Sequence, residues 1–221
     1  MGYKFNYIKN NELFDRLKYL QISKNEIEYL ERSEDEFKSV GHLVKNVDKI
    51  IDLGCGLGRS SIYLKNMLDM DDTIFYLCDF SGEEYDKGPC SNNPCGQHIG
   101  GNIPYNDLSL TERFSKLNNL TNINIIDLSN DNMSKLEEVD VVYSFHCVGY
   151  HWDITESFKE NNLENVISND GVMIFGVRKN KRIHTRETDK ELVTPQKVGS
   201  FTLVETIKGG LLQDYVIYRR I

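Results

Sequence analysis

The fold is decided by one short stretch, Asp52-Leu53-Gly54-Cys55-Gly56-Leu57-Gly58, which lies between the apolar pair Ile50-Ile51 and the helix-like segment 59–64. A β-branched run that meets alternating glycines and then an apolar period of three to four residues predicts a strand, a tight turn and a helix start. Glycines tolerate positive φ angles and lack the Cβ atom that would keep a ligand off the main chain. We therefore expect a ligand to bind directly on this loop, close to its backbone N–H groups.

The spacing of the glycines excludes two common nucleotide-binding loops. A dinucleotide fingerprint needs its third glycine three residues after the second, and that position is Arg59, because Gly58 comes one residue too early. A phosphate-binding P-loop needs Gly-Lys-Ser/Thr after the glycines, which is missing here, and Asp52 would repel a phosphate. The part of the ligand near Asp52 is therefore expected to be uncharged or cationic.

The pattern Asp52-x-Gly54-x-Gly56-x-Gly58 at the end of a predicted first strand resembles motif I of the class I S-adenosylmethionine-dependent methyltransferases. The resemblance implies that Asp52 helps to fix the methionine end of the cofactor, and that the glycines pass under its ribose and methionine portions. It also implies that an acid closing the next strand binds the ribose hydroxyls. Asp79 fits this role, because it ends the apolar run 73–78 about 20 residues beyond the loop, as one helix and one turn require.

The same resemblance extends the cofactor site to the ends of two further strands. Asp127, which ends the predicted third strand 123–127, matches the position that usually receives the adenine amino group in this family. The cofactor-binding residues expected in this way are Asp52, Gly54, Cys55, Gly56, Gly58, Arg59, Ser60, Asp79, Phe80, Asp127, Leu128, Ser144 and Phe145.

Later strand-like runs complete a βα series. Residues 139–145 and 171–177 are predicted to be the fourth and fifth strands, and residues 201–207 and 215–218 flank Lys208-Gly209-Gly210 as a terminal β-hairpin. A helix is predicted before the third strand, over residues 107–114. The resemblance covers about residues 47–221 and implies an α/β, Rossmann-like fold: a mostly parallel seven-stranded sheet with a C-terminal antiparallel hairpin and helices on both faces.

Residues 1–46 carry no strand pattern and are expected to form an N-terminal helical cap. The apolar spacing of residues 11–20 predicts an amphipathic helix, and the capping box from Ser23 to Glu26 predicts a second helix that runs through Leu30. These helices either cap the cofactor cleft or cover only a sheet edge, and the sequence supports both. The irregular segment 81–105 follows Asp79, and a loop of this length is functional or disordered.

The candidate catalytic residues follow the fourth strand, where this family places residues that face the methyl acceptor. Methyl transfer is an in-line displacement that needs an unprotonated acceptor atom, and histidine is the natural base near neutral pH. Residues 144–153 contain His146, His151 and Tyr150, together with the only tryptophan, Trp152. We expect one of the histidines to be the base and Tyr150 to line the acceptor pocket. The alternative is that the histidines only pack and no base is needed.

Charge and composition favour a small-molecule acceptor. The chain has 34 acidic and 26 basic residues and a net charge of −8, which is unfavourable for binding a nucleic-acid backbone. The segment after the fourth strand also lacks the Asn/Asp-Pro-Pro-Tyr/Phe signature of many nucleic-acid amino-methyltransferases. The basic residues of segment 178–186 belong to either a solvated loop or an anion-binding one. We expect O-methylation of a small polar metabolite or sugar derivative, and the segment after the fourth strand weakly resembles bacterial sugar or surface-polysaccharide methyltransferases.

The sequence also bears on compartment and metal content. No stretch approaches the roughly 20 apolar residues of a membrane span, and no signal-peptide pattern is present, so the protein is expected in the cytoplasm. Its five scattered cysteines are expected to be reduced thiols. Cys90, Cys95 and His98 have irregular spacing and no evident fourth ligand, so we expect no metal.

Three other functions stay open from the sequence. The chain could be a catalytically silent, methyltransferase-like partner subunit, although three correctly spaced acids argue against this. It could instead methylate a nitrogen atom of a small amine or a protein. The same fold could also transfer an aminopropyl group or bind a different adenosyl ligand.

Overall fold

The structure is a computed structural model that describes residues 26–81, 108–131, 133–150, 152–179, 182–184, 189–191, 193–210 and 213–221. Several sequence predictions lie outside these residues. They are the helix over residues 11–20, almost all of the irregular segment 81–105 with Cys90, Cys95 and His98, and the candidate base His151.

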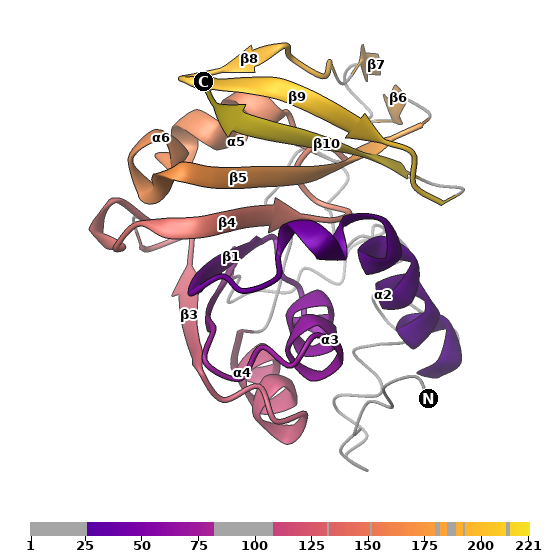
Figure 1. Ribbon diagram of the computed structural model, residues 1–221, viewed down its shortest axis with the longest axis vertical. Coiled ribbons are helices and arrows are strands. Elements are labelled where there is room, and N and C mark those ends of the chain that lie inside the picture. Colours follow the sequence, from indigo (N-terminus) through magenta and orange to yellow (C-terminus); the bar gives the residue numbers. More distant parts are fainter. Residues whose placement is uncertain are drawn as a thin grey trace, which may run out of the picture.

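A single large sheet forms the centre of the molecule (Figure 1). Its strands run in the order β3-β2-β1-β4-β5-β10-β9-β8. The parallel part consists of β1 (Lys49–Leu53), β2 (Ile74–Asp79), β3 (Ile123–Asp127), β4 (Val139–Ser144) and β5 (Ile167–Arg178). The order reverses between β1 and β4, and ligands of open α/β sheets bind at such a switch point, outside the carboxyl ends of the strands.

The C-terminal part of the sheet is antiparallel, as the sequence predicts. β10 (Gln213–Arg220) pairs with both β5 and β9 (Phe201–Ile207), so the terminal hairpin adds its second strand to the parallel sheet. The predicted seven strands become eight here, because the two-residue β8 (Lys197–Val198) pairs with the start of β9. A strand of two residues is too short to show the alternation of apolar and polar residues by which a strand is predicted from the sequence. A separate small sheet joins β6 (Arg182–His184) and β7 (Asp189–Glu191).

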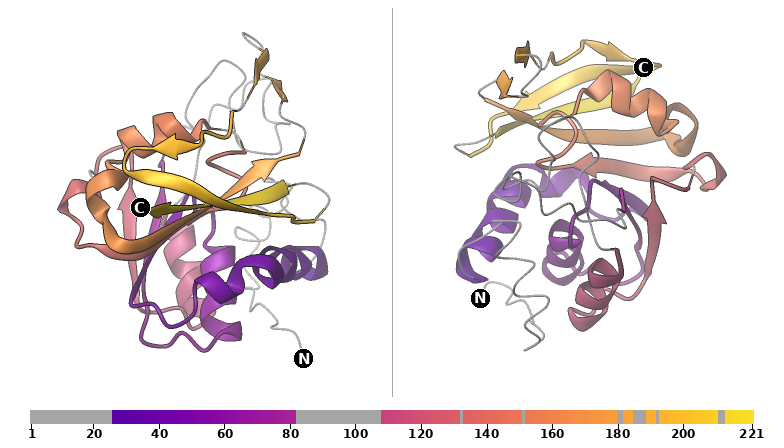
Figure 2. Two further views of the ribbon diagram at one scale, coloured as in Figure 1. Left: turned by 45° about the horizontal axis from the view of Figure 1, so that its top comes forward. Right: turned by 180° about the vertical axis from the view of Figure 1, so that it is seen from behind.

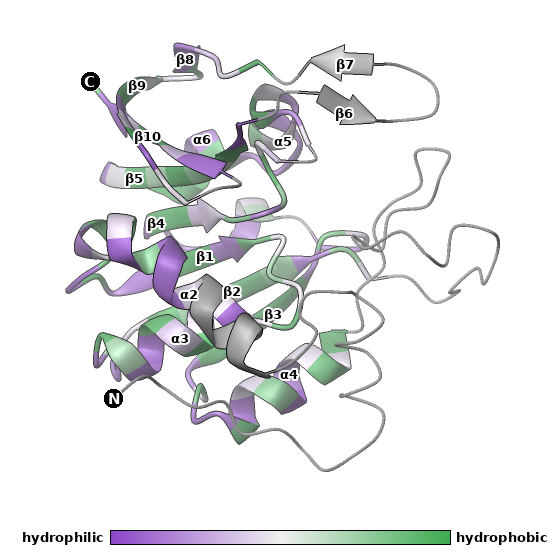
Figure 3. Cartoon of the chain, turned by 90° about the vertical axis from the view of Figure 1, so that its right-hand side faces the viewer, coloured by the Kyte–Doolittle hydropathy of each residue, from purple (hydrophilic) through white to green (hydrophobic). Residues whose placement is uncertain are grey.

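Helices cover both faces of the sheet, and Figure 2 shows the sheet between the two groups. The first face carries α2 (Glu26–Val40), η1 (Gly41–Leu43), α3 (Arg59–Met67) and α4 (Leu108–Leu117), whose apolar side chains pack in one buried cluster. The second face carries η2 (Met133–Lys135), α5 (Ile154–Glu160) and α6 (Leu163–Val166) over a second cluster. Figure 3 shows green apolar residues along the central strands and alternating green and purple bands on α4.

The helix α2 extends ten residues further than the sequence predicts, to Val40 instead of Leu30. Its buried side chains are a mixture of polar and apolar residues, Ser33, Glu36, Phe37 and Val40. Because half of this buried stripe is polar, the apolar period that identifies an amphipathic helix is weak in this region.

Phe37 anchors α2 on the aromatic centre of the first cluster. Its ring stacks on Tyr63 with a centroid distance of 5.9 Å, and it meets Phe145 and Tyr143 edge-on at 5.3 and 5.9 Å. Only 6% of the Phe37 surface is exposed. The docking of α2 therefore depends on aromatic packing.

Replacing this ring tests the docking of α2. We expect Phe37→Ala to lower the free energy of unfolding by about 3–5 kcal/mol in urea denaturation, since it leaves a cavity among three other rings. Val204→Ala is the control: Val204 is 45% exposed, so that change should stay within about 0.5 kcal/mol. Equal, small effects of both substitutions would contradict the packing of α2 on the core.

Candidate active site

The glycine loop lies at the carboxyl end of β1 and leads directly into α3. The backbone N–H groups of Gly54 and Cys55 both donate to the carbonyl oxygen of Cys78, at 2.8 and 3.0 Å, so the loop is held against the end of β2. Gly54, Gly56 and Gly58 all have positive φ angles, of 76°, 55° and 76°. A residue with a Cβ atom would be strained at each of these positions.

The three glycines face different surroundings. A Cβ atom added at Gly54 would lie 2.3 Å from Sγ of Cys147, and one at Gly58 would lie 3.1 Å from Oγ of Ser115. A Cβ atom at Gly56 would meet no described atom within 4 Å. Gly54 and Gly58 are thus small because the protein packs on them, whereas at Gly56 no atom of the described ranges fills the position of a Cβ atom.

Asp79 lies directly beside Gly56. One carboxylate oxygen of Asp79 accepts from the backbone N–H of Gly56 at 2.8 Å, and the other accepts from the N–H of Phe80 at 2.8 Å. The hydroxyl of Thr111 on α4 donates to the carbonyl oxygen of Gly56 at 2.6 Å. These bonds hold the open side of the loop and the carboxylate in one fixed arrangement.

Asp52 lies deeper, with 3% of its surface exposed. Its Oδ2 accepts from the hydroxyls of Ser61 at 2.8 Å and Tyr143 at 2.9 Å. Burial raises the pKa of Asp52 to about 7, although both hydroxyls favour the ionised form. The charge of this carboxyl therefore changes in the neutral pH range.

Asp127 closes β3 next to the end of β2. Its two oxygens accept from four donors of its own surroundings: the N–H and the hydroxyl of Ser81, the N–H of Ser129 and the amide of Asn130. Burial opposes ionisation, but these hydrogen bonds outweigh it and lower the pKa of Asp127 to about 2. The N–H of Leu128 donates to the carbonyl oxygen of Asp79 at 2.9 Å, which ties the two strand ends together.

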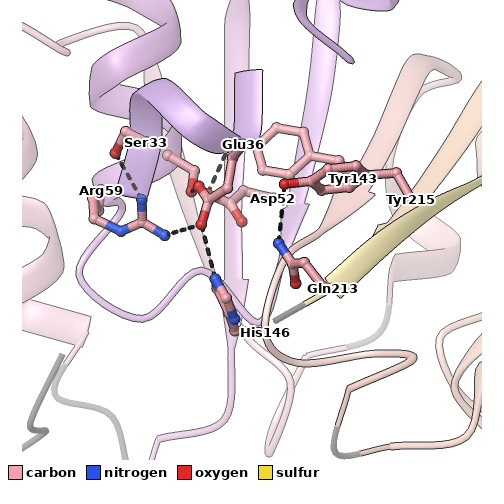
Figure 4. Close-up of polar contacts among 9 residues, drawn as sticks. Ser33, Glu36, Asp52, Arg59, Tyr143, His146, Gln213 and Tyr215 are labelled. Atoms are coloured by element: carbon pink, nitrogen blue, oxygen red, sulfur yellow. Dashed lines mark hydrogen bonds and ion pairs between the residues drawn. The ribbon is translucent and has the colours of Figure 1, made fainter. Parts of the chain in front are cut away.

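A buried ion cluster joins α2, α3 and the segment after β4 (Figure 4). Oε1 of Glu36 accepts from Nη2 of Arg59 at 2.5 Å and lies 3.0 Å from Nε2 of His146. Its Oε2 accepts from the hydroxyl of Ser60 at 3.1 Å, and Nη1 of Arg59 donates to Ser33 at 2.7 Å. The expected cofactor residues Arg59 and Ser60 thus direct their side chains to Glu36.

Glu36 carries a charge although 2% of its surface is exposed. Burial raises its pKa, but the charge of Arg59 and the contact with His146 outweigh burial and lower the pKa to about 2. Glu36 was not predicted as a site residue, because an acid on a helix rich in charged residues normally faces solvent. The signal that was available is its position, beside the apolar Phe37 and three residues after Ser33.

The residues after β4 enter the site through their backbone as well as their side chains. The hydroxyl of Ser144 donates to the carbonyl oxygen of Leu53 at 2.6 Å and accepts from the N–H of Val148 at 3.0 Å. Phe145 is buried and stacks on Tyr143 with a centroid distance of 5.0 Å. His146 has a positive φ angle of 65°, which is unusual for a residue with a side chain and is concentrated at functional sites.

The rings of His146 and Tyr150 lie side by side. They meet edge-on with a centroid distance of 5.0 Å, and the guanidinium of Arg178 lies 4.1 Å from the centre of the Tyr150 ring. The structure therefore brings two of the three expected catalytic residues together, whereas His151 lies outside the described residues.

Another buried polar group near this region was missed by the sequence analysis. Gln213 at the start of β10 donates from Nε2 to the hydroxyl of Tyr215 at 3.2 Å, and 3% of its surface is exposed. Its Oε1 is buried and has no hydrogen-bond partner in the described part of the chain. A buried oxygen of this kind suits a donor group from a ligand.

The described residues contain no group of three or more His, Cys, Asp or Glu side chains that could hold a metal ion. None of the helices in the described ranges combines the length and the apolar character that crossing a bilayer requires.

Comparisons with known proteins support the fold. No protein-family model matches the sequence, and the curated proteins contain no significant match. Among solved structures, the mitomycin 7-O-methyltransferase MmcR has a TM-score of 0.58 at 8% identity, over 96% of this chain and 67% of that one. A TehB-like SAM-dependent methyltransferase from Corynebacterium glutamicum has a TM-score of 0.53 at 14% identity, over 96% of this chain and 97% of that one.

The chain is shorter than some of these neighbours. LaPhzM has a TM-score of 0.57 at 11% identity, and the match covers 94% of this chain but 56% of LaPhzM. At 8–14% identity, these likenesses over 94–96% of the chain concern its fold. This chain therefore has the Rossmann-like fold of the class I S-adenosylmethionine-dependent methyltransferases.

Proposed function

We propose that this chain is an S-adenosylmethionine-dependent methyltransferase that acts on a small polar metabolite or sugar derivative, at an oxygen atom. The observation that carries the proposal is the open side of Gly56, which lies next to the buried carboxylate of Asp79 at the carboxyl ends of β1 and β2. This arrangement supports binding of a ribose that carries two hydroxyl donors.

The residues of the site fit this cofactor. Gly56 leaves space for a ligand to lie against the main chain, and Asp79 supplies a carboxylate to the ribose hydroxyls. Asp52 lies behind the loop, where its negative charge suits the cationic methionine end. Phe80 and Leu128 belong to the adenine side, because they follow the ends of β2 and β3.

When bound, S-adenosylmethionine supplies a methyl group that the acceptor oxygen attacks, while sulfur keeps the electron pair of the broken bond. The chain's own part is to hold the acceptor in line and to take its proton. His146 lies at the end of β4 within the buried ion cluster, and Tyr150 forms a wall beside it. We assign the acceptor pocket to this segment.

Several observations support a small, oxygen-containing acceptor. The net charge of −8 disfavours a nucleic acid. Two solved neighbours, MmcR and a protein from Burkholderia thailandensis, are described as O-methyltransferases. The Burkholderia protein has a TM-score of 0.56 at 10% identity, over 95% of this chain and 68% of that one. The unbridged thiols of Cys55, Cys78 and Cys147 fit a reducing compartment, so we place the protein in the cytoplasm. We also propose residues 1–46 as a helical cap on the domain 47–221, and Glu36 of α2 supports a place for the cap at the cleft.

Cofactor binding is the first test of this function. Isothermal titration calorimetry with S-adenosylmethionine and S-adenosylhomocysteine should show binding of both. We expect Asp79→Asn to weaken binding by about 1–3 kcal/mol, since two hydroxyls lose a charged acceptor. Asp140→Asn is the matched control. Asp140 accepts hydrogen bonds from the N–H groups of Asp48 and Lys49 at the amino ends of β1 and β4, away from the glycine loop. No binding by the wild type would remove the proposal.

The space at Gly56 gives a second test. We expect Gly56→Ala to fold with a loss of only about 1–2 kcal/mol from the left-handed backbone, but to bind S-adenosylmethionine at least about tenfold more weakly. The added methyl group would occupy the surface on which the ligand lies. Gly210→Ala, whose Cβ atom also meets no described atom within 4 Å, should bind normally. Normal binding by Gly56→Ala would place the ligand elsewhere.

The raised pKa of Asp52 predicts a pH dependence of binding. Below its pKa of about 7 Asp52 carries a proton, and a cationic ligand favours the ionised form, so binding releases a proton. Affinity for S-adenosylmethionine should therefore rise between about pH 6 and about pH 8. Calorimetry in buffers of different ionisation enthalpy measures the released proton, and Asp52→Asn should abolish this release. If Asp52→Asn releases as many protons on binding as the wild type, Asp52 is not the group that ionises when the cofactor binds.

A further inference from the structure

The contact between Glu36 and His146 fixes where the histidine carries its proton. Glu36 is ionised at neutral pH, because its pKa is about 2, so its oxygens only accept hydrogen bonds. Nε2 of His146 lies 3.0 Å from Oε1 of Glu36. Nε2 must therefore be the donor in this contact, and a neutral His146 keeps its lone pair on Nδ1.

The other nitrogen of His146 is available for chemistry. Within the described ranges no hydrogen bond to Nδ1 of His146 is found, whereas Nε2 is held by a buried carboxylate. The side chain of His146 is 25% exposed, compared with 2% for Glu36. Nε2 is thus held by a buried carboxylate, while part of the His146 side chain stays exposed.

His146 lies between two residues that pack on or beside the glycine loop. The next residue, Cys147, packs directly on Gly54, and the preceding Phe145 packs on Tyr143, the partner of Asp52. The backbone of His146 adopts the left-handed region to make this placement, at a cost of about 1–3 kcal/mol. A strained backbone of this kind persists mainly at functional sites, where the strain is part of the geometry that function requires.

We propose that Glu36 is a positioning residue, which holds His146 so that Nδ1 faces the methyl acceptor as the proton-accepting atom. The inference rests on the proposed function. In this step the acceptor O–H bond would break and its proton would bond to the lone pair of Nδ1. The oxygen electron pair would form the bond to the methyl carbon, while the sulfur–methyl bond would break and leave its electron pair on sulfur. The resulting imidazolium is stabilised by the Glu36 carboxylate and later gives its proton to water.

The decisive measurement is nitrogen NMR of the wild-type protein labelled at histidine. His146→Asn identifies the signals, because asparagine tolerates a left-handed backbone. At about pH 9, where an ordinary imidazole is neutral, we expect a proton on Nε2 of His146 and none on Nδ1. A proton on Nδ1 instead would overturn the proposal, and this result needs no measurement of turnover.

A pair of variants tests the role of the carboxylate. In Glu36→Gln the Nε2 proton should exchange with water about tenfold faster, because a neutral hydrogen bond replaces a charge-assisted one. Ser33→Ala is the control, since Ser33 contacts Arg59 and not His146. Equal exchange rates in wild type and Glu36→Gln would contradict the positioning role. If Glu36→Gln does not fold, the wild-type measurement and the ligand test below decide the matter.

The ligand test separates this inference from the proposed function. S-adenosylmethionine carries a methyl group on a positively charged sulfur atom, and S-adenosylhomocysteine lacks both this methyl group and this charge. The two ligands should therefore shift the Nδ1 signal differently. Binding of both without such a difference would overturn the role of Nδ1 and leave the cofactor assignment intact. Absence of binding would overturn the proposed function, and with it the catalytic part of this inference.

Discussion

The structure depends on a carboxylate that is almost completely removed from water. Glu36 comes from a helix before the sheet, Arg59 starts the helix after the glycine loop, and His146 follows β4. A buried ion pair is unfavourable unless its geometry is good and its remaining hydrogen bonds are satisfied. Ser33 and Ser60 supply those bonds. The charges of this cluster come from three segments that are far apart in the sequence. Their burial is therefore favourable only when the three segments meet in this arrangement.

The same cluster determines the shape of the candidate site. Phe37 docks α2 by packing on Tyr63, Tyr143 and Phe145. The neighbouring Glu36 then reaches both Arg59 at the start of α3 and His146 after β4. On the opposite side, Asp79 and Asp127 pair in register at the ends of β2 and β3. The parallel sheet thus fixes the side where we propose that the ribose binds, and α2 fixes the side where methyl transfer is proposed.

Sequence patterns predicted the sheet well because its strands are strongly apolar and bounded by glycines and acids. The positions of Asp52, Asp79 and Asp127 at successive strand ends were found in this way. The length of α2 was not, because polar Ser33 and Glu36 share its buried face with Phe37. The packing of Cys147 on Gly54 had no signal in the sequence, since it depends on two segments meeting in space. Glu36 was missed for a different reason: a charged residue is normally expected to be exposed, and the neighbouring Phe37 and the preceding Ser33 gave only a weak sign of its burial.

The four hydrogen bonds on Asp127 have a consequence for how a purine would be selected if the proposed cofactor binds here. A carboxylate has about four lone-pair positions, and Ser81, Ser129 and Asn130 already supply four donors. An exocyclic amine would have to displace one of these donors to gain a bond to Asp127. Discrimination between nucleobases would then come from the shape of the surface around Phe80 and Leu128, and analogues with an altered six-position should be accepted with little penalty.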